Sequence, residues 1–377
     1  MPGADRMLLD VAAARPAGSA TDPAHPAPAS SPASNAQLVR LMGGGQGQTP
    51  AVPYLAEALH RRLQAGGLAL VGGLIGPVDG DEALVASLRR WQAAHHLPPT
   101  GALDTATEQS LVGTLVDRGR VDDAVHLVVD LYDLDHAGRT FTAETDPTFY
   151  ARLGIGTAAE TQCRPEVSAP DAAGQAEMAA RGMRFDPTAG GNHVLFPVRS
   201  PTTGPPGASA PRERYARFVR TVMHEMHHVG ECRPGRTDAE RVAGLPAEEF
   251  DSYALVIFPG TKAVPAVSDD AISEYLGNAL DYWDQLRPQD RTPARIHMCQ
   301  RLRAEIFRIQ AEDVDLDPAH PRLPDWAGDD RVDTARALLG RYDVLPPDVR
   351  TPHLDDLARR LRAFIEPPSE PEMPPLW

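Results

Sequence analysis

The chain has 377 residues, 42% of them apolar and 6% aromatic, and its formal net charge at pH 7 is −15. This length implies two or more domains, and the apolar content allows a substantial core. The negative charge argues against a nucleic-acid partner, because a polyanion is bound by a basic surface. It also disfavours tight adhesion to an anionic cell envelope. Lys262 is the only lysine beside many arginines, a usage typical of a GC-rich bacterial genome.

The two ends of the chain differ in composition from the rest. Residues 1–48 are rich in Ala, Pro, Ser and Gly and predict a disordered tail, and residues 367–377 form a second, Pro-rich tail. No apolar run of the length of a signal peptide follows a basic start, and no transmembrane helix is visible, so we expect no membrane insertion. We therefore expect a soluble bacterial protein that folds in the cytoplasm and whose export would need a non-classical route.

Cysteine usage points to the same compartment. The chain has three cysteines, Cys163, Cys232 and Cys299. This number is too small for a disulfide framework and leaves one odd thiol, which favours folding in a reducing compartment. A Cys163 thiolate that caps a metal ion as a latency switch is a further hypothesis.

The first predicted elements are helices between residues 53 and 111. Apolar residues at helical spacing mark two of them: Leu55, Leu59 and Leu63 in the first, and Leu88 and Trp91 in the second. A turn at Pro98–Gly101 precedes a third helix, which Asp104 caps and Leu111 closes. Residues 84–111 resemble the second half of a peptidoglycan-binding-like domain of three helices. The family pattern is an aromatic-Gln pair, Leu, Thr-Gly, Asp, Thr and Leu, found here as Trp91-Gln92, Leu97, Thr100-Gly101, Asp104, Thr107 and Leu111. The resemblance implies a small domain over residues 49–116 that serves as a packing module or binds peptidoglycan.

Two segments after this module have strand character. They are residues 126–132, His-Leu-Val-Val-Asp-Leu-Tyr, and residues 193–198, His-Val-Leu-Phe-Pro-Val. We expect a short sheet beside the helix that follows, with the second segment as its edge strand, because it ends at a proline.

Residues 224–228 read His-Glu-Met-His-His and are the main functional clue. Flanking apolar residues at helical spacing predict a helix over about 211–229, whose apolar stripe centres on Val222. His224 and His228 lie one turn apart on nearly the opposite side, so both imidazoles can reach one Zn²⁺ ion. Glu225 beside them can act as the general base toward a metal-bound water. A solvated histidine cluster is the alternative, and His227, off this face, is a bystander.

A third ligand is expected from a second helix. Residues 245–254 place Glu248 and Glu249 at its start, where the helix dipole favours acids even without a metal. Here the sequence resembles the gluzincin class of zinc metallopeptidases, in which a glutamate about twenty positions after the second histidine completes the site. Glu248 fits that spacing and is slightly preferred, whereas Glu249 begins the run Glu-Phe-Asp-Ser-Tyr that is similar to the pattern of some H-E-x-x-H proteins. Asp238 is a further alternative.

The rest of the chain reads as helical. Helices are predicted around residues 272–283, 296–309 and 335–339, and we expect them to build the far wall of a cleft. An additional donor for the oxyanion is also expected, with Tyr253, Tyr275 and His297 as the candidates.

The sequence thus predicts an α+β, mainly helical protein. The resemblances imply a zincin-like metallopeptidase domain over residues 117–366, preceded by the small module at 49–116. The expected activity is zinc-dependent hydrolysis of peptide bonds in a protein or peptide substrate, as in an effector or toxin. The alternatives are a murein peptidase guided to the cell wall by the module, and a non-catalytic binding protein on a zincin scaffold.

Overall fold

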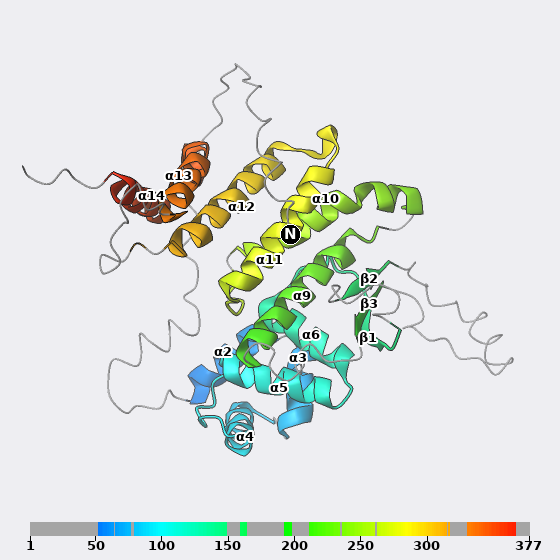
Figure 1. Cartoon of the computed structure of the whole chain (residues 1–377). Helices are drawn as coiled ribbons and strands as arrows, with labels where there is room; N and C mark the ends of the chain where they lie inside the picture. The colour runs from blue at the N-terminus through cyan, green and yellow to red at the C-terminus, as the bar shows by residue number, and fades with distance from the viewer. Residues whose placement is uncertain are drawn as a thin grey trace, which may run out of the picture.

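The computed structural model describes residues 52–63, 65–76, 79–148, 159–163, 192–197, 211–233, 236–260, 262–314, 316 and 330–366. The predicted tails, 1–48 and 367–377, lie outside the described residues. Helices dominate the described part and a three-stranded sheet lies at one side, which confirms the mainly helical α+β class (Figure 1). None of the described helices combines the length and the apolar character that crossing a membrane requires.

The N-terminal part contains four helices where the sequence resemblance implied three. They are α2 (Val52–Arg62), α3 (Ala65–Ile75), α4 (Asp81–Ala94) and α5 (Thr105–Asp117). The additional one, α3, consists of apolar residues and glycines, with Val71 fully buried. The amide of Gly67 in this helix donates a 2.7 Å hydrogen bond to the Asp130 carboxylate, which holds α3 against the helix α6 (Val121–Tyr132).

The turn between α4 and α5 is closed by the motif residues themselves. The buried Gln92 side chain donates to the carbonyl of Ala102 at 2.9 Å and to Thr107 Oγ1 at 3.0 Å, and it accepts from the Gly101 amide at 2.8 Å. Gly101 has a φ of 75°, and a Cβ there would lie 2.8 Å from a Val85 methyl group, so only glycine fits. Asp104 caps α5 as predicted. These residues are therefore accounted for by the folding of the turn.

Residues 126–132 are helical, so the predicted strand is wrong. They belong to α6 (Val121–Tyr132), in which Val121, Val125 and Val128 are buried on one face at helical spacing. The short run of β-branched residues has the composition of a strand. The spacing of the apolar residues from Val121 onward, however, is that of a helix that packs on two sides. Tertiary packing therefore overrides the local propensity.

The sheet contains β1 (Phe141–Asp146), β2 (Glu160–Gln162) and β3 (Asn192–Pro197) in the order β1-β3-β2. β3 pairs in parallel with β1 and antiparallel with β2, so the strand expected at the edge is central among the described strands. Its buried Val194, Leu195 and Phe196 explain this, because a nearly continuous apolar run suits a central position. Among the described strands, β2 lies at one end of this order, and it contacts the helix α9 (Pro211–Glu231).

Six further helices complete the described chain. They are α9 (Pro211–Glu231), α10 (Asp238–Ile257), α11 (Asp269–Gln285), α12 (Pro293–Glu312), α13 (Asp330–Asp343) and α14 (Pro352–Ile365). In Figure 1, α9 lies between the N-terminal helices and the pair α10 and α11, whereas α12, α13 and α14 gather at the opposite end. The predicted C-terminal helices are thus present.

One continuous apolar core joins the N-terminal helices to α9, so the sequence boundary expected near residue 116 does not coincide with a break in packing. A polar group inside this core links four helices. Glu108 of α5 accepts hydrogen bonds from Arg62 of α2 and from the Tyr132 hydroxyl of α6, which lies 3.2 Å from the Tyr215 hydroxyl of α9. The buried charge is thereby paired, as a low-dielectric interior requires.

Candidate metal centre

One face of helix α9 packs in the core, and another face lines an open cleft. Val219, Val222 and Met226 are completely buried in the core, whereas His224 and His228 line the cleft. The predicted amphipathic arrangement is therefore present. Its physical reason is the helical period, which places residues three and four apart on one face.

Helix α10 begins earlier than predicted, at Asp238. Thr237 caps it, and Thr237 and Glu240 form a reciprocal capping box that satisfies the first backbone amides. Pro246 lies inside the helix, not at its start. The glutamates at 248 and 249 are therefore in the middle of a helix, where the preference of acids for a helix N-terminus does not account for them.

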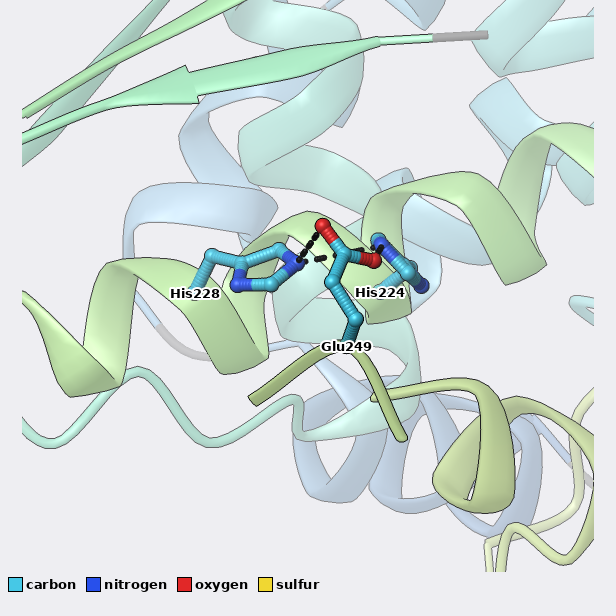
Figure 2. A group of neighbouring side chains, drawn as sticks. All are labelled: His224, His228 and Glu249. Atoms are coloured by element: carbon cyan, nitrogen blue, oxygen red, sulfur yellow. Dashed lines mark hydrogen bonds and ion pairs between the residues drawn. The ribbon is translucent and has the colours of Figure 1, made fainter. Parts of the chain in front are cut away.

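Glu249 reaches the two histidines (Figure 2). Its Oε2 lies 3.2 Å from His224 Nε2, and its Oε1 lies 3.5 Å from His228 Nε2. The two Nε2 atoms are 3.1 Å apart. Within the described part of the chain, His224, His228 and Glu249 are the one group of His, Cys, Asp and Glu residues whose ligand atoms converge in this way, all within 4.8 Å of one another.

These separations fit a small divalent cation. A tetrahedral zinc site with bonds of about 2.1 Å holds its ligand atoms about 3.4 Å apart. The three measured separations, 3.1, 3.2 and 3.5 Å, are close to that value. Two imidazoles and one carboxylate also match the donor types of catalytic zinc sites, which leave a fourth position open toward the substrate. All three residues line the cleft, so the arrangement could hold such an ion.

The other candidate ligands are placed elsewhere. The preferred Glu248 is not part of the converging group and forms an ion pair with Arg236. One residue of helix rotates a side chain by about 100°, which explains why neighbouring glutamates face different partners. Asp238 is the first residue of α10, about three turns before Glu249. The structure thus brings Glu249, and not Glu248, to His224 and His228.

The ionisation of the group reflects this proximity. Burial raises the pKa of Glu249, but hydrogen bonds with His224 and His228 outweigh it and lower the pKa to about 2. Burial lowers the pKa of His228, whereas the hydrogen bond to Glu249 and the charge of Glu225 raise it, and the net shift is upward. The neighbouring acids therefore favour the protonated form of His228, and a cation that binds there competes with this proton.

Glu225 lies beside the three candidate ligands and is only 4% exposed. Its Oε2 accepts a 2.7 Å hydrogen bond from the Thr161 hydroxyl of β2. Both residues line the cleft. A carboxylate that is held at one oxygen and lines the cleft is suited to accept a proton there.

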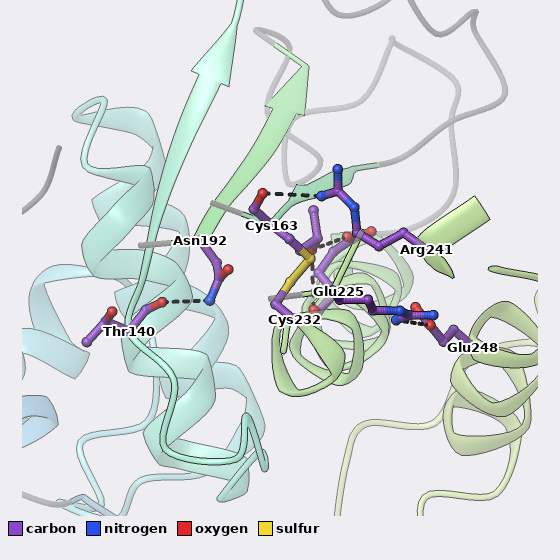
Figure 3. The surroundings of a disulfide bond; sticks show 9 residues. Thr140, Cys163, Asn192, Glu225, Cys232, Arg241 and Glu248 are labelled. Atoms are coloured by element: carbon purple, nitrogen blue, oxygen red, sulfur yellow. Dashed lines mark hydrogen bonds and ion pairs between the residues drawn. A yellow bond between two sulfur atoms is a disulfide. The ribbon is translucent and has the colours of Figure 1, made fainter. Parts of the chain in front are cut away.

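A disulfide bond fixes β2 to α9 (Figure 3). Cys163 follows β2 and Cys232 follows α9, and their sulfur atoms are bonded. The cysteine count did not predict this bond, and the hypothesis of a Cys163 thiolate that caps a metal ion is wrong, because Cys163 is bonded to Cys232. Cys299 is the free cysteine and is buried. Sequence spacing could not reveal the pair, because the two cysteines are 69 positions apart and adjacent only in the fold.

The cleft has a volume of about 780 Å³ and is bounded by four elements. α9 forms the floor, β2 and α10 form two sides, and α11 contributes Tyr275, Asn278 and Tyr282 to the remaining wall. Of the predicted C-terminal helices, therefore, only α11 lines the cleft among the described residues. The exposed side chains of Val242 and Leu245 on α10 give the rim an apolar lip.

Two of the three predicted oxyanion donors line this cleft. The Tyr253 ring contacts the His224 ring edge to face, with centroids 4.6 Å apart. Burial raises the pKa of Tyr253, and burial raises the pKa of Tyr275 to about 12, so both phenols stay protonated and can donate. His297 instead lies at the surface, with its Nδ1 3.3 Å from a carboxylate oxygen of Asp348. Sequence reasoning missed Thr161, Asn278 and Tyr282, which carry no motif and are brought to the cleft only by the fold.

Comparisons of the chain with known protein families, with curated proteins and with solved structures found no match.

Proposed function

We propose that the protein is a zinc-dependent peptidase whose metal ligands are His224, His228 and Glu249. The observation that carries the proposal is the convergence of their ligand atoms, with Glu225 adjacent, on the floor of an open cleft. Two imidazoles, one carboxylate and a neighbouring unliganded carboxylate are the donor set of a hydrolytic zinc site. The separation of roles follows from helix geometry, because Glu225 projects about 100° away from His224.

A bound zinc ion would supply a water of lowered pKa and a positive charge that polarises a peptide carbonyl. Glu225 accepts the proton of that water and delivers it to the leaving amine. Thr161 holds the carboxylate of Glu225 in place by donating to Oε2. Tyr253, which contacts His224, is the candidate hydrogen-bond donor toward the developing oxyanion.

The proposed substrate is a protein or peptide in extended conformation. Residues Glu160 and Thr161 of β2 line the cleft, so an extended segment bound there would run beside this strand. The motif residues that suggested peptidoglycan, Gln92, Gly101 and Thr107, are bonded to one another instead. We therefore prefer a protein over the cell wall as the substrate.

The test combines metal analysis with Glu225→Gln. The purified protein should contain about one zinc per chain, and it should cleave casein or members of a random peptide library. E225Q should keep the zinc and lose hydrolysis by at least about 1000-fold, because the general base is removed while the ligands remain. A metal-free protein, or an E225Q variant with full activity, contradicts the proposal. Release of muropeptides from purified sacculi in the same assay would identify the cell wall, instead of a protein, as the substrate class.

A further inference from the structure

Arg220 lies on α9 one helical turn before His224 and lines the same cleft. Residues four apart project from one face, so Arg220, His224 and His228 form a row along the floor. The helix rises about 1.5 Å per residue, which places the Cα atoms of Arg220 and His224 about 6 Å apart. A group bound at Arg220 is therefore close to the bond that the proposed metal site attacks.

The guanidinium of Arg220 is buried without an anionic partner in the described structure. The residue is only 6% exposed. Its terminal nitrogens donate to the carbonyl oxygens of Val256 and Pro265, the second at 3.3 Å, and its Nε has no hydrogen-bond partner. Among the described residues, Tyr275 is the ionisable side chain that affects the pKa of Arg220, and Tyr275 is neutral at pH 7.

The contrast with Arg217, one turn earlier on the same helix, makes this arrangement informative. Arg217 is paired with Glu213 and, at 2.9 Å, with Glu274, an acid that lines the cleft. The charge of Glu274 is thus already balanced. Buried cations in proteins are normally matched by an anion, because neutral carbonyl groups only partly replace the lost hydration. The two carbonyl bonds orient the Arg220 guanidinium but leave its charge uncompensated.

We infer that Arg220 binds a carboxylate group of the substrate in this cleft. The inference rests on the proposed peptidase function and adds a substrate class to it. An extended peptide advances about 3.4 Å per residue, so the carboxylate would lie within about two residues of the scissile bond. Both a C-terminal carboxylate and an acidic side chain meet this requirement. The guanidinium suits either, because its planar array of donors matches the two oxygens of a carboxylate.

The experiment uses dipeptide hydroxamates, which bind zinc directly and report on the cleft without turnover. Three probes share one backbone: the first has a free C-terminal carboxylate, the second has a C-terminal amide, and the third has the amide and a glutamate side chain. Their dissociation constants are measured by titration calorimetry on the zinc-loaded full-length protein and on the variants Arg220→Met, Arg220→Lys and Arg217→Met. R217M is the matched control, because Arg217 lies on the same helix but is already paired.

The wild-type protein and R217M should bind at least one carboxylate probe about 10-fold more tightly than the amide probe, a difference typical of a charge-assisted hydrogen bond. R220M should reduce this preference below about 2-fold while its affinity for the amide probe stays unchanged, and R220K should keep part of it. The first and third probes identify which source of carboxylate is recognised.

If R220M bound all three probes more weakly by the same factor, Arg220 would only hold the end of α10. That result would overturn the inference. Absence of any carboxylate preference in the wild-type protein would do the same, and this measurement does not depend on the folding of a variant. Failure of the proposed function is distinguishable from both outcomes. A protein that retains zinc and cleaves peptides but ignores the carboxylate overturns the inference alone, whereas a protein without zinc overturns both.

Discussion

The Thr161 hydroxyl donates a hydrogen bond of 2.7 Å to Oε2 of Glu225, across 64 positions of sequence. This bond connects the edge strand β2 to the proposed general base on α9. It occupies one carboxylate oxygen and so fixes the direction of the other. The proposed base is therefore positioned by the sheet as well as by its own helix.

Replacing Thr161 by Val should lower kcat on the order of 10-fold and leave KM and zinc content unchanged. Valine keeps the shape of threonine but removes the donor, so Glu225 loses its orientation and not its neighbours. Thr161→Ser, which retains the hydroxyl, should behave like the wild-type protein. Steady-state kinetics on one peptide substrate measures the effect, and a T161V variant with wild-type kcat would show that Glu225 is held by other contacts.

Replacing Glu249 by Gln should weaken zinc binding by at least about 100-fold, whereas Glu248→Gln should change it by less than about 3-fold. The reason is that Glu249 lies 3.2 Å from His224 Nε2, whereas Glu248 is paired with Arg236. Competition against a chromophoric zinc chelator gives both dissociation constants. The reverse order of the two variants would restore Glu248 as the ligand.

Removing the disulfide by the double substitution Cys163→Ser and Cys232→Ser should lower the free energy of unfolding by about 4 kcal/mol. The bond closes a long loop between residues 69 positions apart, and such loops lose the most conformational entropy in the unfolded chain. Urea denaturation of the oxidised wild-type protein and of the double variant measures the difference. Reducing agent should destabilise the wild-type protein alone; equal urea midpoints for the two proteins would show that the bond does not form.

The pair of His126 and Asp122 should make stability depend on pH. Burial lowers the pKa of His126, but its hydrogen bonds to Asp122 outweigh this and raise the pKa above its ordinary 6.5. Burial raises the pKa of Asp122, but bonds from His126 and the Ala143 amide lower it below 3.8. The histidine contribution is complete below about pH 6.5 and is lost as pH rises through the raised pKa. The aspartate contribution is present above about pH 3.8 and is lost as pH falls through the lowered pKa.

His126→Gln should therefore lower the melting temperature at pH 5.5 and have a smaller effect at pH 8.5. The side chain of His126 is 41% exposed, so solvent screening limits the difference to less than about 1 kcal/mol. Differential scanning fluorimetry at the two pH values compares the variant with the wild-type protein. A larger loss at the higher pH would reverse the sign and exclude the pair as its cause.

Local patterns predicted the helices and the histidine pair, because helical periodicity and the spacing of His224 and His228 are properties of neighbouring residues. They could not choose between Glu248 and Glu249. That choice depends on where α10 begins and how it is rotated against α9, which in turn depends on the capping box at Thr237 and on tertiary packing.

The strands were harder to predict for a related reason. Residues 126–132 have the β-branched composition of a strand, yet α6 buries Val125 and Val128 against other helices. β2 is only three residues long and carries no periodic signal, although it supplies Thr161 and precedes Cys163. Short elements that obtain their stability from neighbours leave little trace in composition.

The hydrogen-bonded group of Arg62, Glu108, Tyr132 and Tyr215 limits how this chain can be processed. Proteolytic cleavage that released α2 to α5 would leave the hydroxyls of Tyr132 and Tyr215 without the carboxylate of Glu108 and would expose the apolar side of α9 to water. We therefore expect that the N-terminal helices are not a propeptide that is shed to activate the proposed peptidase. They pack on the side of α9 opposite to the one that carries His224 and His228.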